Sequence, residues 1–487
     1  MHTLGYTEKV VVIGAGISGL ACAFRLKQLG LAPVVLESKN TPGGVIQTVQ
    51  RNGYLFEAGP QCPRFPEPVW KLVRDLRLEN QFVAGDPKAS RYILRNGRLH
   101  LAPFSPGGLL RTGLVDFRSK LRILTEVFGR TAPPDQEESL AEFVQRKFGE
   151  ELADYLLDPL ISTIFLADPR KMGMQSAFPQ LVDWERTRGS LIRGALAARR
   201  SSRSHAAPRA SSTSHKQKPK TTNLRVTDAL PSLGSFTSGM GLLPAALARE
   251  LGENVRYGQR VASVSASQGV TGEPNSGWTV HLNNGPEITA ESLVLAVPAY
   301  TAASLLEQSA PQLASLLDAI EYSPVCVVSA AYHQPSVSRP LDGFGFMAPR
   351  KEGLQTICTF WNSSLFAGRA PSGKALVTSF AGRDAHSTLF TGAEADSAQI
   401  VHAENARVLG ITGEPVDRMV WRNTRALPQY NVGHAQRVMQ ITETLRQLPN
   451  LHLAGSYLTG RSIADCAQIA FHVAQNVHSR SEGKNIQ

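Results

Sequence analysis

The sequence lacks the features that mark membrane-spanning and disulfide-rich proteins. It has no run of roughly twenty uninterrupted apolar residues, so we expect no spanning helix. Its five cysteines, at positions 22, 62, 326, 358 and 466, have no short pair spacing and fit neither a disulfide framework nor a zinc site. The apolar run Lys9–Ile13 is reached without a charged leader and a cleavage site, so we expect a cytoplasmic protein.

Clusters of residues that carry acid–base, nucleophilic or metal chemistry are also missing. No paired carboxylates, no nucleophile beside a base and no set of metal ligands stands out along the 487 residues. We therefore assign no single catalytic residue and no metal. The apolar fraction of 42% and the charged fraction of 19% are those of a soluble globular protein, with room for two or three domains.

The net charge of +11 is concentrated in one segment. Between Arg193 and Arg225 there are six arginines, three lysines and no acid. Residues 201–225 are rich in Ser, His and Pro and have almost nothing apolar to bury, so we expect a disordered basic insertion. Because this segment has no aromatic residue for base stacking, we expect no nucleic-acid partner; a solvated loop is favoured, and contact with a membrane surface is the next alternative.

A dinucleotide site is predicted at the N-terminus. The strand-like run Lys9–Ile13 ends in Gly14-Ala15-Gly16-Ile17-Ser18-Gly19 and is followed by a helical stretch over residues 21–29. In such a motif the first glycine allows the turn, the second lets a pyrophosphate approach the backbone, and the third packs helix on strand. A second strand, residues 32–36, ends at Glu37, where a carboxylate can accept hydrogen bonds from ribose hydroxyls and would repel the phosphate of NADP.

Two further glycine-rich segments distinguish FAD from NAD. The segments Thr41-Pro42-Gly43-Gly44 and Gly53 to Pro60 resemble the second fingerprint of the large FAD family that holds amine oxidases, phytoene desaturases and protoporphyrinogen oxidases. Near the other end, the segment from Leu451 to Cys466 runs from a strand through a glycine loop into a helix that extends to about residue 477. In this family the equivalent segment covers the flavin, with its helix N-terminus facing the pyrimidine edge, where a helix dipole favours the reduced anion.

Landmarks along the whole chain resemble the porphyrinogen oxidase branch of that family. The most specific is Ala426-Leu427-Pro428-Gln429-Tyr430 with Gly433-His434 nearby. The others are Arg91 to Gly97, Ile164 to Pro169, Ser235 to Pro244 and Gly343-Phe344-Gly345.

The resemblance implies oxidation of protoporphyrinogen IX to protoporphyrin IX by bound FAD, with O2 as the acceptor and hydrogen peroxide released, as a late step of heme biosynthesis. It also implies peripheral contact with the inner face of the cell membrane and transfer of the product to a ferrochelatase. Oligomeric state is not indicated. The alternatives are oxidation of coproporphyrinogen III, of an amine or of a carotenoid and, outside the enzymes, a flavin-binding protein without turnover or a basic adaptor.

Site residues also follow from the resemblance. Arg91 matches an arginine placed at a substrate propionate, which a guanidinium can bind bidentately. Met347 and Trp361 lie in stretches that contact the macrocycle in relatives, although both could be core residues. The implied FAD contacts are Gly14, Ala15, Gly16, Ile17, Ser18, Gly19, Glu37, Ser38, Gly43, Gly44, Gly59, Pro60, Gln61, Cys62, Val261, Arg461, Ser462 and Ile463.

The expected fold is multi-domain α/β, with a Rossmann-like FAD-binding domain interleaved with a substrate-binding sheet domain and a helical, membrane-associated lobe. We expect FAD-binding parts at 1–90, 226–300 and 441–487, a combined substrate-binding and helical lobe at 91–200, and the substrate-binding domain at 301–440. Residues 255–265 and 278–282 are expected to pair as a hairpin, and residues 292–297 to form a further strand.

Overall fold

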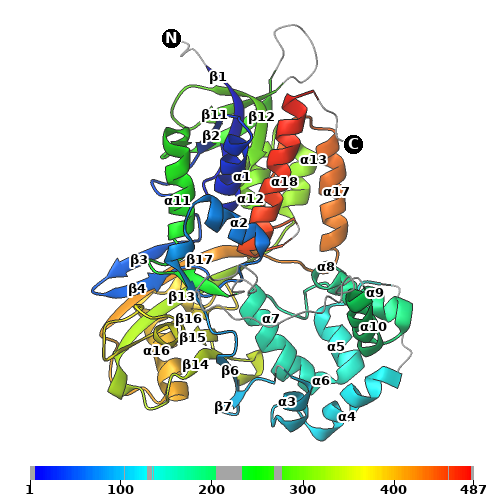
Figure 1. The fold of residues 1–487 in the computed structure, drawn as a ribbon, viewed down its shortest axis with the longest axis vertical. Coiled ribbons are helices and arrows are strands. Elements are labelled where there is room, and N and C mark those ends of the chain that lie inside the picture. The colour runs from blue at the N-terminus through cyan, green and yellow to red at the C-terminus, as the bar shows by residue number, and fades with distance from the viewer. Residues whose placement is uncertain are drawn as a thin grey trace, which may run out of the picture.

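The computed structural model describes residues 6–103, 105–128, 134, 136–204, 233–267, 277–458 and 460–483. The fold is mixed α/β, as the sequence predicts. Figure 1 shows a helix-covered sheet that carries both ends of the chain, a second sheet on the opposite side of the molecule, and a group of helices beside that second sheet. The boundaries given above for the individual domains stay a prediction.

The first sheet is centred on the buried N-terminal strand. Its strand order is β10-β11-β12-β1-β2-β9, and β18 pairs with β12. β1 runs parallel to both β2 and β12, which explains why all three read as apolar runs. The strands are β1 Tyr6–Ile13, β2 Pro33–Leu36, β9 Val255–Arg256, β10 Val261–Ala266, β11 Trp278–Leu282, β12 Ile288–Leu295 and β18 Leu451–Leu453.

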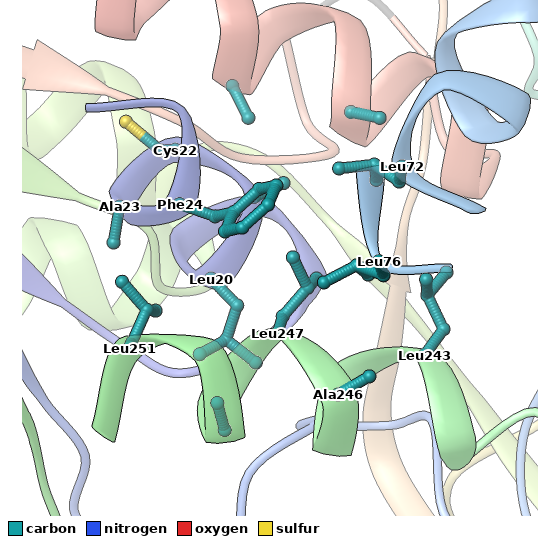
Figure 2. Packing of buried hydrophobic residues seen from close by; sticks show 14 of the residues in the cluster. Leu20, Cys22, Ala23, Phe24, Leu72, Leu76, Leu243, Ala246, Leu247 and Leu251 are labelled. Carbon is teal, nitrogen blue, oxygen red and sulfur yellow. The ribbon is translucent and has the colours of Figure 1, made fainter. Parts of the chain in front are cut away.

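Helices cover both faces of this sheet. On one face α1, α2, α11 and α18 share one apolar cluster, part of which Figure 2 shows. On the other face α12, α13 and α17 pack against the same strands. The helices are α1 Ile17–Gln28, α2 Glu67–Asp75, α11 Leu242–Leu251, α12 Ala299–Leu306, α13 Pro311–Asp318, α17 His434–Arg446 and α18 Ile463–Ser481, with the short η1 Glu79–Gln81 and η4 Gly252–Asn254.

The prediction for residues 255–265 is partly wrong. The hairpin partner of β11 is β10 alone, whereas β9 pairs in parallel with β2 at the opposite edge of the sheet. A turn at Gly258, whose φ of +69° suits glycine, separates the two strands. One short stretch of sequence thus supplies a strand to each edge of the sheet.

The second sheet has the strand order β17-β13-β16-β15-β14-β6-β7. Helix α16 packs against one of its faces. The elements are β6 Ser90–Arg95, β7 Arg98–Leu101, β13 Tyr322–His333, β14 Gly343–Met347, β15 Thr356–Phe360, β16 Lys374–Ala381, β17 Asp417–Pro428, α14 Asn362–Leu365, α15 Thr388–Thr391, α16 Glu394–Leu409, η5 Gln334–Ser336 and η6 Arg350–Glu352. Two small sheets join β3 Thr48–Arg51 to β4 Tyr54–Glu57 and β5 Phe82–Ala84 to β8 Gly234–Phe236.

Residues 106–204 form the helical lobe, which the sequence predicts to be helical. Its elements are α3 Pro106–Arg111, α4 Phe117–Thr125, η2 Glu126–Phe128, α5 Leu140–Phe148, α6 Glu150–Leu152, η3 Ala153–Leu157, α7 Asp158–Phe165, α8 Met174–Ala177, α9 Pro179–Arg188 and α10 Leu191–Ser204. Because α10 continues to Ser204, the expected insertion begins as helix, which corrects the prediction of disorder there. The rest of that insertion, 205–225, lies outside the described residues.

Candidate functional site

The turn after β1 has the shape that the first glycine motif predicts. Gly14 has a φ of +104°, and its amide donates a 2.8 Å hydrogen bond to the carbonyl of Leu36. A Cβ added to Gly19 would lie 1.9 Å from the carbonyl oxygen of Gly14, so the third glycine is required for helix packing. A Cβ added to Gly16 would meet no protein atom within 4 Å. The second glycine therefore presents open backbone.

Glu37 closes this turn from the side. One carboxylate oxygen accepts a 2.8 Å hydrogen bond from the amide of Ala15, and the other accepts from the amide of Lys39 at 2.8 Å and from the Ser38 hydroxyl at 3.3 Å. The carboxylate is buried at the end of β2, where the sequence places the ribose acid. The amide of Gln259 donates to the Glu37 carbonyl, which brings the start of β10, with the predicted residue Val261, toward the same strand end.

The second glycine-rich segment lies against the first. The amide of Gly43 donates a 2.8 Å hydrogen bond to the carbonyl of Ala15, and Gly43 forms a parallel bridge with Gly16. A Cβ on Gly44 would lie 3.4 Å from the Cα of Gly16. Gly43 and Gly44 both have positive φ, of +106° and +62°, so glycine suits both positions. Two backbone segments therefore meet at Gly16.

The end of this second segment connects the two sheets. A Cβ on Gly59 would lie 2.4 Å from the carbonyl of Val45, so this glycine packs directly on the loop. After Pro60, the buried side chain of Gln61 accepts a 2.7 Å hydrogen bond from Asn362, the first residue of α14, which follows β15 of the second sheet. Cys62 follows, and burial raises the pKa of its thiol to about 11.

The C-terminal segment completes the cradle. Ile463, at the start of α18, shares the apolar cluster of Ala15. One turn further on, the Cys466 thiol interacts with the Ser18 hydroxyl at the start of α1. The N-termini of α1 and α18 therefore lie side by side. Ser462 is the N-cap of α18, and its hydroxyl accepts a hydrogen bond from the amide of Asp465.

The residues of this cradle match the expected cofactor. FAD fits this cradle, because Gly16 leaves backbone open, Gly43 and Gly44 bring a second segment beside it, and two helix N-termini offer unpaired amides to the negative diphosphate. Glu37 stands where ribose hydroxyls would donate hydrogen bonds. The fingerprint residues quoted from the sequence are thus gathered at one place, and their individual contacts with FAD stay a prediction.

The second sheet separates the three predicted substrate residues. Arg91 lies opposite Gly345 and Ile93 opposite Met347, so these residues share one face with the apolar cluster around Ile93. Trp361 is fully buried in the cluster on the other face, with its ring 5.5 Å from that of Tyr92. The structure therefore brings Arg91 and Met347 together and places Trp361 on the opposite side of the sheet.

Arg91 is held half-buried at this face. Its guanidinium lies 4.3 Å from the centre of the Phe344 ring, and Nη1 donates to the carbonyl of Ala89 at 3.3 Å. Burial lowers the pKa of the guanidinium from its ordinary value, while the nearby Cys62 thiol acts in the opposite direction. Arg91 therefore presents a cation, partly shielded from water, beside the segment that ends the second fingerprint.

A polar cleft of about 270 Å³ separates the helical lobe from the second sheet. Arg350 and Arg383 line it and also join the two parts. The Nε of Arg350 donates to Asp158 at 3.0 Å, and a guanidinium NH of Arg383 donates to the hydroxyl of Ser162 at 3.1 Å. Both acceptors belong to α7, so this cleft is the seam between lobe and sheet.

A buried ion pair that is not among the predicted site residues lies beneath the second fingerprint. Glu57 accepts hydrogen bonds from Thr48 at 2.6 Å and from the amide of Met240 at 2.8 Å, and the Nη1 of Arg369 lies 3.5 Å from its carboxylate. Burial, the largest effect, raises the pKa of Glu57 to about 7. The signal in the sequence is a carboxylate that directly follows the buried run Tyr54 to Phe56.

Comparison with known proteins agrees with this geometry. Residues 17–478 match the family model described as flavin containing amine oxidoreductase. The chain is similar to a chloroplastic protoporphyrinogen oxidase of Nicotiana tabacum, at 31% identity over 96% of this chain and 85% of the tobacco protein. It is also similar to a coproporphyrinogen III oxidase of Bacillus subtilis, at 28% identity over 94% of this chain and 95% of that protein.

Among solved structures, a candidate protoporphyrinogen oxidase from Exiguobacterium sp. 255-15 shares the fold, with a TM-score of 0.78, 21% identity and coverage of 97% of this chain and 99% of that one. The family model spans most of the sequence, and the tobacco relative matches nearly all of it. The chain therefore belongs to the family of flavin containing amine oxidoreductases, and its cofactor is FAD.

Proposed function

We propose that the protein oxidises protoporphyrinogen IX to protoporphyrin IX, a loss of six electrons, with O2 as the final acceptor and hydrogen peroxide as the second product. The relatives that match nearly the whole chain carry this activity or the corresponding coproporphyrinogen activity in their names. The observation that supports a porphyrinogen most directly is the half-buried Arg91 on the same sheet face as Met347.

Bound FAD supplies two-electron redox chemistry to this reaction. The side chains of the chain supply placement. Arg91 offers a planar cation that can bind a propionate through two parallel hydrogen bonds, and the Phe344 ring beneath it limits the directions in which the guanidinium can point. Phe360, which is partly exposed on the same face, offers apolar surface that suits a macrocycle, and Met347, which is buried in the cluster around Ile93, packs beside it. Trp361 packs in the apolar cluster on the opposite face of this sheet.

Side-by-side assay of protoporphyrinogen IX and coproporphyrinogen III tests the substrate. The holoenzyme should convert the first to its fluorescent porphyrin with oxygen uptake, at a higher kcat/KM than the second. Faster turnover of coproporphyrinogen III would favour the alternative substrate. Turnover of neither compound by protein that carries FAD would refute both.

Replacement of Arg91 tests the propionate contact. Arg91→Ala should raise KM by about tenfold or more and change kcat less, because a hydrogen bond to a charged group is worth about 1.5–3 kcal/mol. Arg91→Lys keeps the charge but lacks the planar guanidinium, so its KM should lie between those of the wild type and Arg91→Ala. Arg95→Ala is the matched control on the same strand, since Arg95 pairs with Glu151 of the lobe. An unchanged KM in Arg91→Ala would remove the propionate role.

We further propose that the helical lobe contacts an anionic membrane surface. Phe117, Leu121, Leu124 and Phe128 recur at helical spacing along α4 and η2 and are 78%, 50%, 53% and 82% exposed. Basic residues, Arg118 and Arg122 among them, accompany this apolar stripe, a composition that suits an interfacial helix. Figure 1 shows α4 at the end of the molecule farthest from the first sheet. None of the described helices is long and apolar enough to cross a bilayer.

Vesicle binding tests this contact. The double variant Phe117→Ser and Leu121→Ser should sediment several-fold less with vesicles that contain phosphatidylglycerol, with thermal stability unchanged because both side chains are exposed. Met439→Ser is the matched control, since Met439 is 65% exposed on α17, in a different part of the molecule. Equal vesicle binding by the wild type and the double variant would contradict the proposal. Transfer of the product to a ferrochelatase stays a prediction.

A further inference from the structure

An arginine stands immediately before α18, in the C-terminal glycine loop. Arg461 donates from Nη1 to the carbonyl oxygens of Phe165, at 3.0 Å, and Pro428, at 2.9 Å. Its guanidinium lies 4.6 Å from the centres of both the Phe165 and Tyr430 rings. The side chain therefore joins the C-terminal glycine loop to the helical lobe and to the end of β17.

The charge of this arginine is buried without a balancing carboxylate. The Nε and Nη2 atoms of Arg461 are sealed from solvent and have no hydrogen-bond acceptor, and within the described residues no carboxylate forms an ion pair with it. Burial lowers the pKa of the guanidinium to about 10, so the group stays protonated at neutral pH. Tyr430 and, after it, Asp465 oppose this shift of the pKa, and the Asp465 carboxylate is already hydrogen-bonded to Ser462.

The position of this charge relates it to the cofactor cradle. Arg461 adjoins Ser462, the N-cap of α18, and one turn into that helix Cys466 interacts with Ser18 of the first glycine motif. The positive end of the α18 dipole and the guanidinium therefore lie at the same end of the helix. Charge interactions reach further in a protein interior than in water, so both act on a charge that develops in the cradle.

We propose that Arg461 stabilises the negative charge of reduced FAD and so raises the reduction potential of the bound cofactor. The inference rests on the proposed function, since FAD must occupy the cradle. Arg461 would then have an electrostatic role in addition to its structural contacts with the neighbouring segments. The structural role depends on the shape of the side chain, whereas the electrostatic role depends on its charge.

The reduction potential of the FAD-loaded protein distinguishes the two. In Arg461→Gln, which keeps an amide donor for the two carbonyls, the equilibrium constant for two-electron reduction should fall by about tenfold, or about 30 mV. In Arg461→Lys, which keeps the charge, it should stay within about threefold of the original value. Arg425→Gln is the matched control, because Arg425 lies over the Tyr300 ring at 3.8 Å but is exposed to solvent, and no change is expected.

Either of two results would overturn the proposal: an unchanged potential in Arg461→Gln, or equal shifts in Arg461→Gln and Arg461→Lys. If Arg461→Gln does not retain FAD, Asp465→Asn carries the test, since removal of the opposing negative charge should raise the potential. No rise in that variant would also overturn the proposal. A wild-type protein that never binds FAD would instead refute the proposed function, whereas the expected shifts without porphyrinogen turnover would refute only the substrate.

Discussion

The helical lobe buries a network of charges beside its apolar cluster, whereas the helices on the first sheet meet through apolar side chains. Around the first sheet, α1, α11 and α18 meet through apolar residues such as Leu20 and Leu247, both fully buried (Figure 2). In the lobe, the carboxylate of Glu185 is fully buried, with the Nη1 of Arg146 at 2.9 Å and the Nζ of Lys147 at 2.8 Å. The helices on the first sheet thus meet by close apolar packing, whereas the lobe adds a buried network of charges to its own apolar cluster and leaves the apolar side chains of α4 exposed.

The largest effect is expected where packing is tightest. Gly19→Ala should lower the free energy of unfolding by about 4 kcal/mol and abolish FAD binding, because the new Cβ would overlap the carbonyl of Gly14. Gly16→Ala should leave the unfolding of the FAD-free protein within about 1 kcal/mol, because its Cβ meets nothing within 4 Å, yet should weaken FAD binding. Denaturant unfolding and FAD titration measure both. Equal losses of stability would contradict this distinction.

Breaking the charge network of the lobe should have the next largest effect. Glu185→Gln leaves the buried Lys147 without its closest carboxylate and should destabilise the lobe by about 3 kcal/mol. Limited proteolysis should then cut the lobe sooner while the flavin spectrum is retained. Glu443→Gln is the control, because its pair with Arg446 is exposed and worth less than about 1 kcal/mol. Loss of flavin together with the lobe would show that the two halves unfold as one.

A smaller effect on stability is expected from the buried carboxyl group of Glu57, beneath the second fingerprint. Burial raises the pKa of Glu57 from 4.5 to about 7. Between these two values the folded protein keeps a proton on Glu57 that the unfolded chain releases. The contribution of Glu57 to the free energy of unfolding is therefore complete below about pH 4.5 and falls by about 2–3 kcal/mol as the pH rises through 7. Glu57→Gln should flatten this part of the stability profile, measured as the thermal midpoint from pH 5 to pH 8. An unaltered slope in the variant would show that another group carries it.

The sequence predicts the parts of the site that depend on local spacing. The turn from Gly14 to Gly19 and the acid at Glu37 could be placed because a strand, a turn and a helix follow one another directly. The resemblance indicates Arg91 and Met347 as substrate residues. Whether their side chains share a face depends on the register between β6 and β14, and Trp361 lies on the other face. No single-chain pattern determines that register.

The sequence also does not predict contacts between distant segments. Glu57 and Arg369 are 312 residues apart, and nothing near either residue indicates the other. For Arg461, resemblance suggested a contact with the cofactor, whereas the direction of its side chain depends on Phe165 and Tyr430, two aromatic residues from other parts of the chain.

The pairing of β18 with β12 and the packing of α18 on α1 set an order of events during synthesis. The glycine turn at the start of the chain leaves the ribosome hundreds of residues before the helix that must lie beside it. The vitamin-derived cofactor can therefore be enclosed only after residues 451–481 have been synthesised, and a premature stop codon shortly before residue 451 would yield a long but colourless polypeptide.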